Sequence, residues 1–206
     1  AYEVMCDVYR PLFINKSPIS HTSVETAEMI KYASNSFLAL KISYINEIAN
    51  LCELVGADVH DVASEMGKDG RISGKFLHPG PGFGGSCFPK DLESLSSISD
   101  EHGVQMDTLL AAITANRKQK KQMCNKLEKL VPKGIKGKVI AVLGLSFKAN
   151  TDDIRESSSI DMINFILSMG GNVRAYDPIA NNAMSQLFSN ISYFKDVYEA
   201  IKKADA

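Results

Sequence analysis

The longest regular pattern of apolar residues runs over residues 23–55, where no Gly or Pro occurs before Gly56. Its apolar residues repeat at helical spacing on two faces. One face carries Ile30, Phe37, Leu40, Tyr44, Ile48 and Leu51, and the other carries Leu38, Ile42, Ile45, Ala49 and Cys52. A helix that is apolar on more than one side is buried on more than one side. The pattern therefore predicts a spine helix that packs against its own domain and against a partner subunit.

Shorter helical patterns follow the long one. They lie at residues 58–66, 89–99 and 105–131. The first two are separated by a loop with seven glycines from Gly67 to Gly85. Pro89 suits the first turn of its helix, where the backbone N–H has no partner to lose. Pro132 and Gly134 end the last helix, and the residues just after them are a predicted domain boundary.

After this boundary the pattern changes to short apolar runs, which are typical of buried parallel strands. We expect a strand at 138–144, an amphipathic helix at 157–169 and a second strand at 173–176. Residues 185–206 supply at most one more strand and helix. The predicted fold class is α + α/β. Residues 23–131 would form a helical central dimerisation domain with a long spine helix, and residues 132–206 would form a partial Rossmann-like parallel α/β domain.

Composition and charge exclude several function classes. Of the 206 residues, 45% are hydrophobic and 23% are charged, and the net charge is −1, which is typical of a globular protein. No run of about 18 apolar residues is present, so we expect no membrane partner. Residues 117–138 contain nine Lys or Arg and one acid. We interpret them as a solvated helix end and linker, with no nucleic-acid partner, because no aromatic residues interleave with the cations.

The cysteines and histidines show no metal-binding spacing. Cys6, Cys52, Cys87 and Cys124 form no CxxC pair, which argues against both a zinc site and a disulfide framework. Reduced thiols are typical of a cytoplasmic protein, and we expect that location. His60, His78 and His102 are likewise too scattered to predict a metal site.

The strongest candidate for chemistry is the segment Gly82-Phe-Gly-Gly-Ser-Cys87-Phe-Pro-Lys-Asp91. A cysteine just before a helix start lies at the positive end of the helix dipole among free backbone amides, which favours thiolate over thiol. The same amides can stabilise an oxyanion formed when the thiolate attacks a carbonyl. Asp91, one turn later, can serve as a general base. The alternative is a small cysteine of the core.

Two further pairs of polar residues are candidates. Lys31 and Asn35 share one face of the long helix and can polarise a carbonyl or hold an alkoxide, although each can also be an ordinary surface polar residue. Lys148 and Arg155 follow the first predicted strand, where open α/β sheets bind ligands and where phosphates meet cations. The alternative for Arg155 is a surface pair with Asp153. The segment Gly144-Leu-Ser-Phe-Lys148 is not a GxGxxG, so this half does not encode a plain dinucleotide site.

Three motifs stand in a fixed order along the chain. They are Glu25-Thr-Ala-Glu-Met-Ile-Lys31-Tyr-Ala-Ser-Asn35, the Gly82–Asp91 segment, and Gly144-Leu-Ser-Phe-Lys148 with Thr151-Asp-Asp153-Ile-Arg155-Glu-Ser-Ser. They are similar to the central-helix motif, the nucleophile loop and the nucleotide-sugar domain signature of the UDP-glucose/GDP-mannose dehydrogenase family. The resemblance covers nearly the whole chain.

The resemblance implies an enzyme that oxidises the C6 alcohol of a nucleotide sugar to an acid with two NAD+. A cysteine captures the aldehyde, a second hydride transfer gives a thioester, and water then cleaves the thioester. In this sequence Cys87 would be the nucleophile. Lys31 and Asn35 would stabilise the oxyanions, and Asp91 would help to activate water.

The resemblance also implies the binding residues. The nucleotide sugar would contact Phe76, Leu77, His78, Pro79, Gly80, Phe83, Gly84 and Lys148. Lys90 and Arg155 would reach NAD. Arg71 would serve the site of a neighbouring subunit, which agrees with a homodimer formed through the helix 23–55.

The substrate and the extent of the protein follow from the same resemblance. The segment from Gly70 to Gly82 is similar to family members that oxidise UDP-glucose, and UDP-glucose is therefore our first choice of substrate. GDP-mannose and a UDP-N-acetyl-hexosamine are the alternative substrates. A non-catalytic dimerisation or nucleotide-sugar-binding module is the alternative function. Residues 1–22, with Pro11 and Pro18, would be the tail of a missing N-terminal NAD-binding domain. We therefore expect a fragment that alone binds NAD poorly and does not turn over.

Overall fold

The computed structural model describes residues 1–12 and 19–206, and these form two units, residues 1–34 and 35–206. The first unit contains α1 (Tyr2–Tyr9), the 3-10 turn η1 (Arg10–Leu12) and the start of α2 (Val24–Val55). The sequence pattern did not predict α1. This helix ends just before Pro11, so that proline does not interrupt it, and Pro18 lies outside the described residues.

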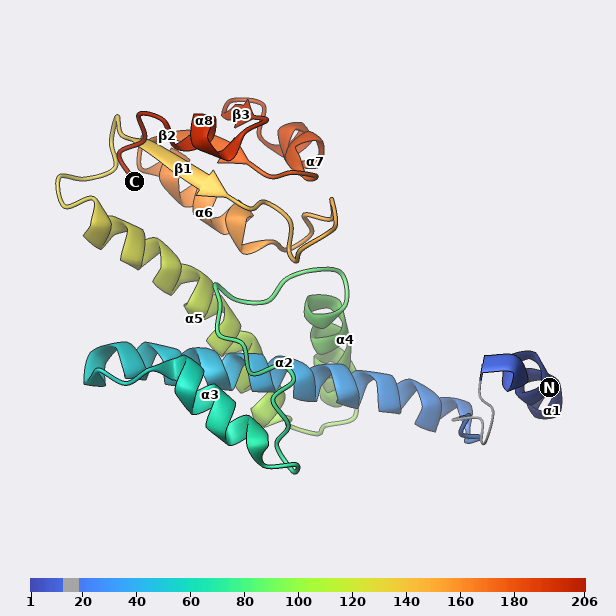
Figure 1. The fold of residues 1–206 in the computed structure, drawn as a ribbon. Coiled ribbons are helices and arrows are strands. Elements are labelled where there is room, and N and C mark those ends of the chain that lie inside the picture. The colour runs from blue at the N-terminus through green and yellow to red at the C-terminus, as the bar shows by residue number, and fades with distance from the viewer. Residues whose placement is uncertain (13–18) are drawn as a thin grey trace. The chain divides into compact units, whose positions relative to one another are not determined.

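The second unit begins with helices, as the sequence predicted. The rest of α2 is followed by α3 (Val59–Lys68), α4 (Phe88–Glu101) and α5 (Asp107–Leu130) (Figure 1). Gly56 ends α2 with a φ of +76°, a backbone conformation that residues with a Cβ rarely adopt. Asp58 then caps α3, because its side chain accepts a hydrogen bond from the N–H of His60.

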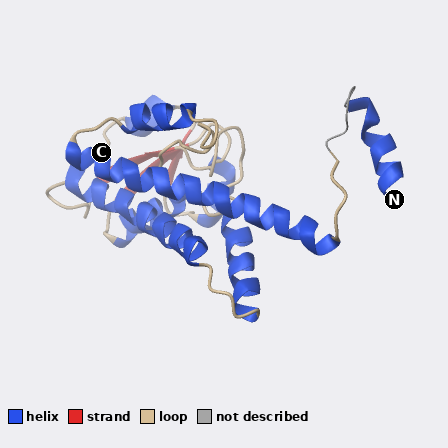
Figure 2. Cartoon of the chain, turned by 90° about the horizontal axis from the view of Figure 1, so that it is seen from below, coloured by secondary structure: helices blue, strands red, loops and turns tan. Residues whose placement is uncertain are grey.

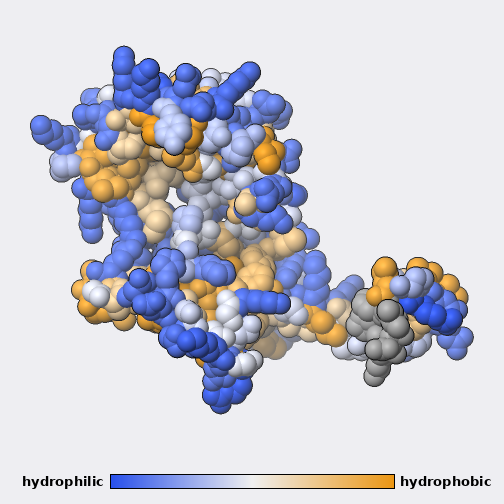
Figure 3. Space-filling view, in the orientation of Figure 1, coloured by the Kyte–Doolittle hydropathy of each residue, from blue (hydrophilic) through white to orange (hydrophobic). Residues whose placement is uncertain are grey.

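The two apolar faces of α2 have different surroundings. Ile45, Ala49 and Cys52 are buried in the core of the chain itself, whereas Phe37 and Leu51 are 62% and 55% exposed. Apolar surface also lies at the C-terminal end of this helix, at the left of Figure 3. The chain therefore buries only one of the two faces that the sequence predicted to be buried.

The α/β part of the second unit alternates strands and helices. Its elements are β1 (Val139–Leu143), α6 (Ser158–Ser168), β2 (Asn172–Tyr176), α7 (Asn181–Leu187), β3 (Ser192–Phe194) and α8 (Val197–Ile201). The strands are parallel in the order β1-β2-β3, with Ala141 of β1 opposite Arg174 of β2. Figure 2 shows these strands as one small sheet in a chain that is otherwise mostly helical.

One hydrophobic core holds this sheet and its helices together. The core includes Leu145, Ile163, Ile166, Ala175 and Met184, all without exposed surface. Burial of such side chains is the main stabilising contribution to a domain of this size. The fold class predicted from the sequence, helices with a long spine followed by a Rossmann-like parallel sheet, is confirmed. None of the helices in the described ranges is both long and apolar enough to cross a membrane.

Candidate active site

Cys87 is the N-cap residue of α4 and is exposed to solvent. Its carbonyl oxygen accepts the first hydrogen bond of the helix, from the N–H of Asp91 at 2.8 Å. Pro89 lies in the first turn and has no N–H, so the amides that remain for a ligand at this end belong to Phe88 and Lys90. The structure thus places the cysteine at the helix start, as the sequence predicted.

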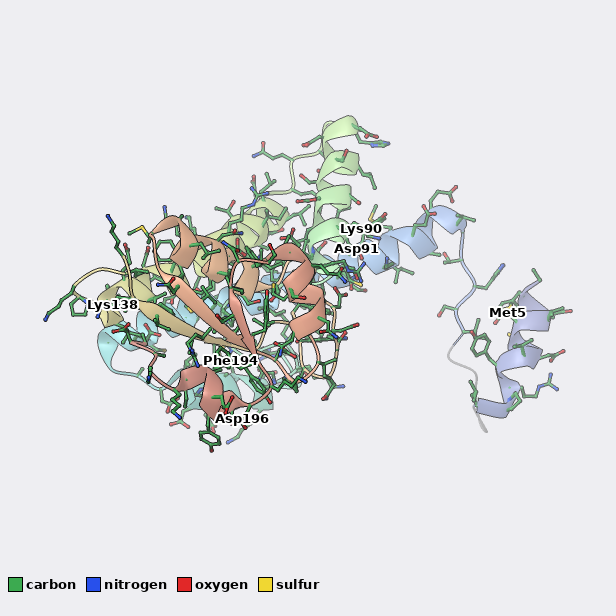
Figure 4. The ribbon with its side chains drawn as sticks, turned by 90° about the horizontal axis from the view of Figure 1, so that it is seen from above. Met5, Lys90, Asp91, Lys138, Phe194 and Asp196 are labelled. Carbon is green, nitrogen blue, oxygen red and sulfur yellow. The ribbon has the colours of Figure 1, made fainter. Side chains whose placement is uncertain are left out.

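Asp91 follows Cys87 by one turn of α4 and is fully buried. Its Oδ2 accepts a hydrogen bond from Nδ2 of Asn35 at 2.5 Å, and Nζ of Lys90 lies 3.7 Å from Oδ1. Lys90 and Asp91 both extend from the first turn of α4 (Figure 4). A buried carboxylate needs such partners because an unpaired charge in the interior is costly. Asn35 and Asp91, which the sequence treated as separate candidates, therefore form one pair.

Lys31 precedes Asn35 by one turn of α2 and belongs to the first unit. Its ammonium lies 6.0 Å from the centre of the Tyr32 ring, which is close enough for a cation–π contact. Its expected role beside Asn35 stays a prediction.

An aromatic cluster connects the predicted substrate loop to the nucleophile. The Phe88 ring, next to Cys87, lies 6.0 Å from the ring of Phe76 and 5.7 Å from that of Phe83, both in edge-to-face contact. Leu77 is only 3% exposed, and it borders a cavity of about 440 Å³ together with His78. The sequence did not single out Phe88, although its position inside the glycine-rich motif was a usable signal.

Buried side-chain amides hold the backbone of this loop. Asn116 accepts from the N–H of Phe83 at 2.8 Å and donates to its carbonyl at 3.0 Å. Asn46 accepts from the N–H of Gly80, and Gln119 donates to the carbonyl of Gly80, both at 2.8 Å. The sequence analysis missed these amides. The signal that could have found them is a polar residue at a position where the helix pattern requires an apolar one.

The nucleophile loop also meets the α/β part of the unit. The N–H of Gly85 donates to the carbonyl of Arg155 at 2.7 Å. A Cβ on Gly84 would lie 2.0 Å from the carbonyl oxygen of Glu156, and one on Gly85 would lie 2.6 Å from the Phe147 ring. Only glycine permits these close approaches. The loops that carry Cys87, Lys148 and Arg155 therefore pack against one another, although they are far apart in the sequence.

Arg155 forms an ion pair with Asp153, which is the alternative to phosphate binding that the sequence left open for this residue. Its Nε and Nη2 donate to the two carboxylate oxygens at 2.9 and 2.6 Å, which lowers the pKa of Asp153 to about 2. The same bond raises the pKa of Arg155, and the charge of Cys87 adds to this increase. The charge of Lys148 also contributes to the low pKa of Asp153. Arg155 thus lies within electrostatic range of Cys87, and Lys148 lies within electrostatic range of Asp153.

Arg71 is exposed and pairs with Asp69. Its guanidinium donates to both carboxylate oxygens of Asp69, and its side chain is 90% exposed. Asp69 thereby fixes the direction of Arg71 at the surface. Among the described residues, Arg71 has no recorded contact with Cys87 or Asp91.

The residues present suit part of a dinucleotide site. The side chains of Lys90 and Arg155 are 68% and 67% exposed, and exposed cations suit the phosphates and the amide oxygen of NAD. The turn from Gly144 to Lys148 lacks the glycine spacing of a pyrophosphate cradle. In the described part of the chain, no three His, Cys, Asp or Glu residues are grouped to bind a metal ion.

Two descriptions of one family match the sequence. The central domain of the UDP-glucose/GDP-mannose dehydrogenase family matches residues 25–118, and the UDP binding domain of that family matches residues 141–206. The chain belongs to this family. Its motifs, recognised from the sequence as similar to the family, lie within these matches.

Relatives support the assignment to the dehydrogenase family. UDP-glucose 6-dehydrogenase of Rhizobium meliloti is 47% identical over 206 residues, and UDP-glucose 6-dehydrogenase TuaD of Bacillus subtilis is 48% identical over 191 residues. They align with 100% and 92% of this chain and with 47% and 41% of their own lengths. A UDP-glucose dehydrogenase structure from Pyrobaculum islandicum has a TM-score of 0.92 at 34% identity, over 98% of this chain and 46% of its own. The chain thus spans about half the length of the curated relatives it matches.

Proposed function

We propose that the whole protein containing this chain is an NAD-dependent UDP-glucose 6-dehydrogenase that forms UDP-glucuronate. The observation that carries the proposal is the surrounding of Cys87. An exposed cysteine lies at the start of α4, one turn from the buried Asp91–Asn35 pair, and the charge of Arg155 reaches it. The similarity to two named UDP-glucose 6-dehydrogenases favours UDP-glucose over the other nucleotide sugars.

The residues of this chain supply nucleophile, oxyanion donors and base. Two molecules of NAD+, bound in turn, would each accept one hydride. Sγ of Cys87 adds to the C6 carbonyl of the aldehyde, and the negative oxygen is stabilised by the amides of Phe88 and Lys90. The second N–H of the Asn35 amide, together with Lys31, serves the same oxygen. In the last step water adds to the thioester carbon, the C–S bond breaks, and Asp91 takes the proton of that water.

Binding residues are proposed by position. Residues 76–80 with Phe83 and Gly84 line the nucleotide sugar, Lys148 contacts its phosphates, and Arg71 serves the neighbouring subunit of a homodimer formed through α2. Lys90 and Arg155 contact NAD. Residues 23–131 form the central domain and 132–206 the nucleotide-sugar domain, with 1–22 belonging to an NAD-binding domain, in a cytoplasmic enzyme.

The test is NADH formation by the encoded protein. UDP-glucose, GDP-mannose and UDP-N-acetylmannosamine are compared as substrates, and we expect the highest kcat/KM with UDP-glucose. Cys87→Ser lowers the rate by at least about a thousandfold, whereas the control Cys124→Ser does not. The 206-residue chain alone should produce no NADH. A rate on none of the three sugars, or an active Cys87→Ser variant, would overturn the proposal.

Alkylation provides a second test of the nucleophile. Cys87 should react with iodoacetamide faster than Cys124, because burial raises the pKa of the Cys124 thiol. Pre-incubation with UDP-glucose should protect Cys87. Equal reaction rates of Cys87 and the partly exposed Cys6 contradict the assignment.

A further inference from the structure

Lys41, on α2, holds a turn of the backbone with its whole ammonium group. Nζ donates to the carbonyl oxygens of Ile72 at 2.9 Å, Ser73 at 3.0 Å and Lys75 at 2.5 Å. An ammonium has three N–H donors and no acceptor, so these three bonds use all of its donors. No carboxylate is among these partners. The ammonium therefore does here what a bound cation does in a ring of carbonyls.

The turn it holds has a strained backbone. Ser73 and Phe76 have φ values of 61° and 64°, which residues with a Cβ adopt at a cost. The N–H groups of Ile72 and Ser73 both donate to the carbonyl of Asp69 at 2.9 Å. Three carbonyl dipoles converging on one point repel one another unless a positive charge lies between them. Loss of the ammonium would therefore favour separation of these carbonyl groups and opening of the turn.

This turn links two predicted binding residues. Arg71 lies just before the turn. Its guanidinium donates a hydrogen bond to Asp69, and its side chain is 90% exposed. Phe76 lies just after it, and its ring contacts Phe88 beside Cys87. A change in the turn would therefore move Phe76 relative to the nucleophile and Arg71 relative to whatever it contacts.

We propose that Lys41 is a positioning residue for nucleotide-sugar binding, which acts by fixing the carbonyls of residues 72–75. The inference rests on the proposed function, since it names a residue that serves the same site. Among the described residues, the Lys41 ammonium donates its hydrogen bonds to backbone carbonyls and not to side chains. Its loss should therefore affect binding of the sugar nucleotide more than the chemistry at Cys87.

The test is Lys41→Ala in the encoded protein. We expect the KM for UDP-glucose to rise about tenfold and kcat to change less than about threefold, because three charge-assisted bonds are lost outside the reacting centre. Backbone amides of residues 72–76 should exchange hydrogen faster. Lys126→Ala is the matched control, since the ammonium of Lys126 also bridges two helices, to Glu53 of α2, but does not contact the turn at 72–75 among the described residues.

Chemical rescue distinguishes the hydrogen bonds of the ammonium from the effect of its positive charge alone. The atoms removed by Lys41→Ala correspond to n-propylammonium, which should restore the KM. Tetramethylammonium has the same charge but no N–H and should not restore it. Lys41→Arg should restore it only in part, because a planar guanidinium cannot direct three donors to one turn in this way.

The outcomes distinguish the two proposals. A wild-type protein that does not oxidise UDP-glucose refutes the proposed function. An active wild type whose KM and amide exchange are unchanged in Lys41→Ala refutes the role of Lys41. Equal rescue by both ammonium ions also refutes it, because the hydrogen bonds would then not matter.

Discussion

The side chain of Asn116 forms two hydrogen bonds to the backbone of Phe83, as a neighbouring β-strand would. Its amide pairs with both the N–H and the carbonyl of Phe83 while being only 8% exposed. Asn116→Ala leaves two buried backbone groups without partners, and we expect a loss of about 2 kcal/mol or more in the free energy of unfolding. Urea unfolding measures this.

Asn125→Ala is the matched control for Asn116, because Asn125 is exposed on the same helix. Its stability should stay within about 0.5 kcal/mol of wild type. Equal stabilities of the two variants would contradict the role of Asn116.

Asp153 gives the protein a defined dependence on pH. Its pKa is about 2 in the folded chain and near 3.8 in an unfolded one, because the Arg155 guanidinium bonds to the charged form. A lowered pKa stabilises the fold above 3.8, and this contribution is lost as the pH falls toward 2. Asp153→Asn should therefore be less stable than wild type at neutral pH, with the difference shrinking between about pH 4 and pH 2.

The measurement for Asp153 is the urea midpoint at several pH values. Asp152→Asn is the control for the loss of one carboxylate from this loop, since Asp152 is exposed and adjacent. If the Asp153→Asn difference is constant with pH, the pair with Arg155 does not exist in solution.

At the scale of elements, α2 has one apolar face that the described residues leave largely exposed. Tyr44 and Leu51 are 48% and 55% exposed on this face. If a second copy covers it, Tyr44→Glu with Leu51→Glu should shift the protein from dimer to monomer in sedimentation velocity, because two charges would be buried without partners. The stability of each chain should change little.

Leu110→Glu is the control for the α2 face, since Leu110 is an exposed apolar residue of α5. It should leave the dimer intact. A wild-type protein that sediments as a monomer contradicts the expectation, as does a double variant that stays dimeric.

Most elements could be predicted because they bury a periodic face. The helix expected at 23–55 is Val24–Val55, and the strand expected at 173–176 is Asn172–Tyr176. Two helices were missed for physical reasons. No residue of α1 is buried, and α7 has seven residues with Met184 as its only buried one. Neither provides the apolar stripe from which a helix is predicted.

At the scale of the second unit, Gly84 joins the nucleophile loop to the α/β part. A Cβ at this position would meet the backbone of Glu156 at 2.0 Å, and backbone cannot move aside as a flexible side chain can. Gly84→Ala should lower the free energy of unfolding by about 1–3 kcal/mol. It should also lower the rate of Cys87 alkylation, since Arg155 would move away from the thiol.

Gly70→Ala tests the contribution of the glycine itself. An added Cβ at Gly70 meets nothing within 4 Å, so its stability should be equal to or slightly above that of wild type. Thermal unfolding of both variants measures the difference. A Gly84→Ala variant as stable as Gly70→Ala would show that the two parts are not in contact there.

The sequence alone determined the helices that carry an apolar stripe, the first two parallel strands, and Cys87 and Asp91 as candidate site residues. It could do so because burial imposes a period on local sequence, and because a glycine-rich segment before a helix start is itself a local feature. Tertiary structure decided that Asn35 bonds to Asp91, that Asn116 holds Phe83, and that Lys41 caps the turn at 72–75. These partners are 56, 33 and 31 or more residues apart, and only the packing of the chain brings them together.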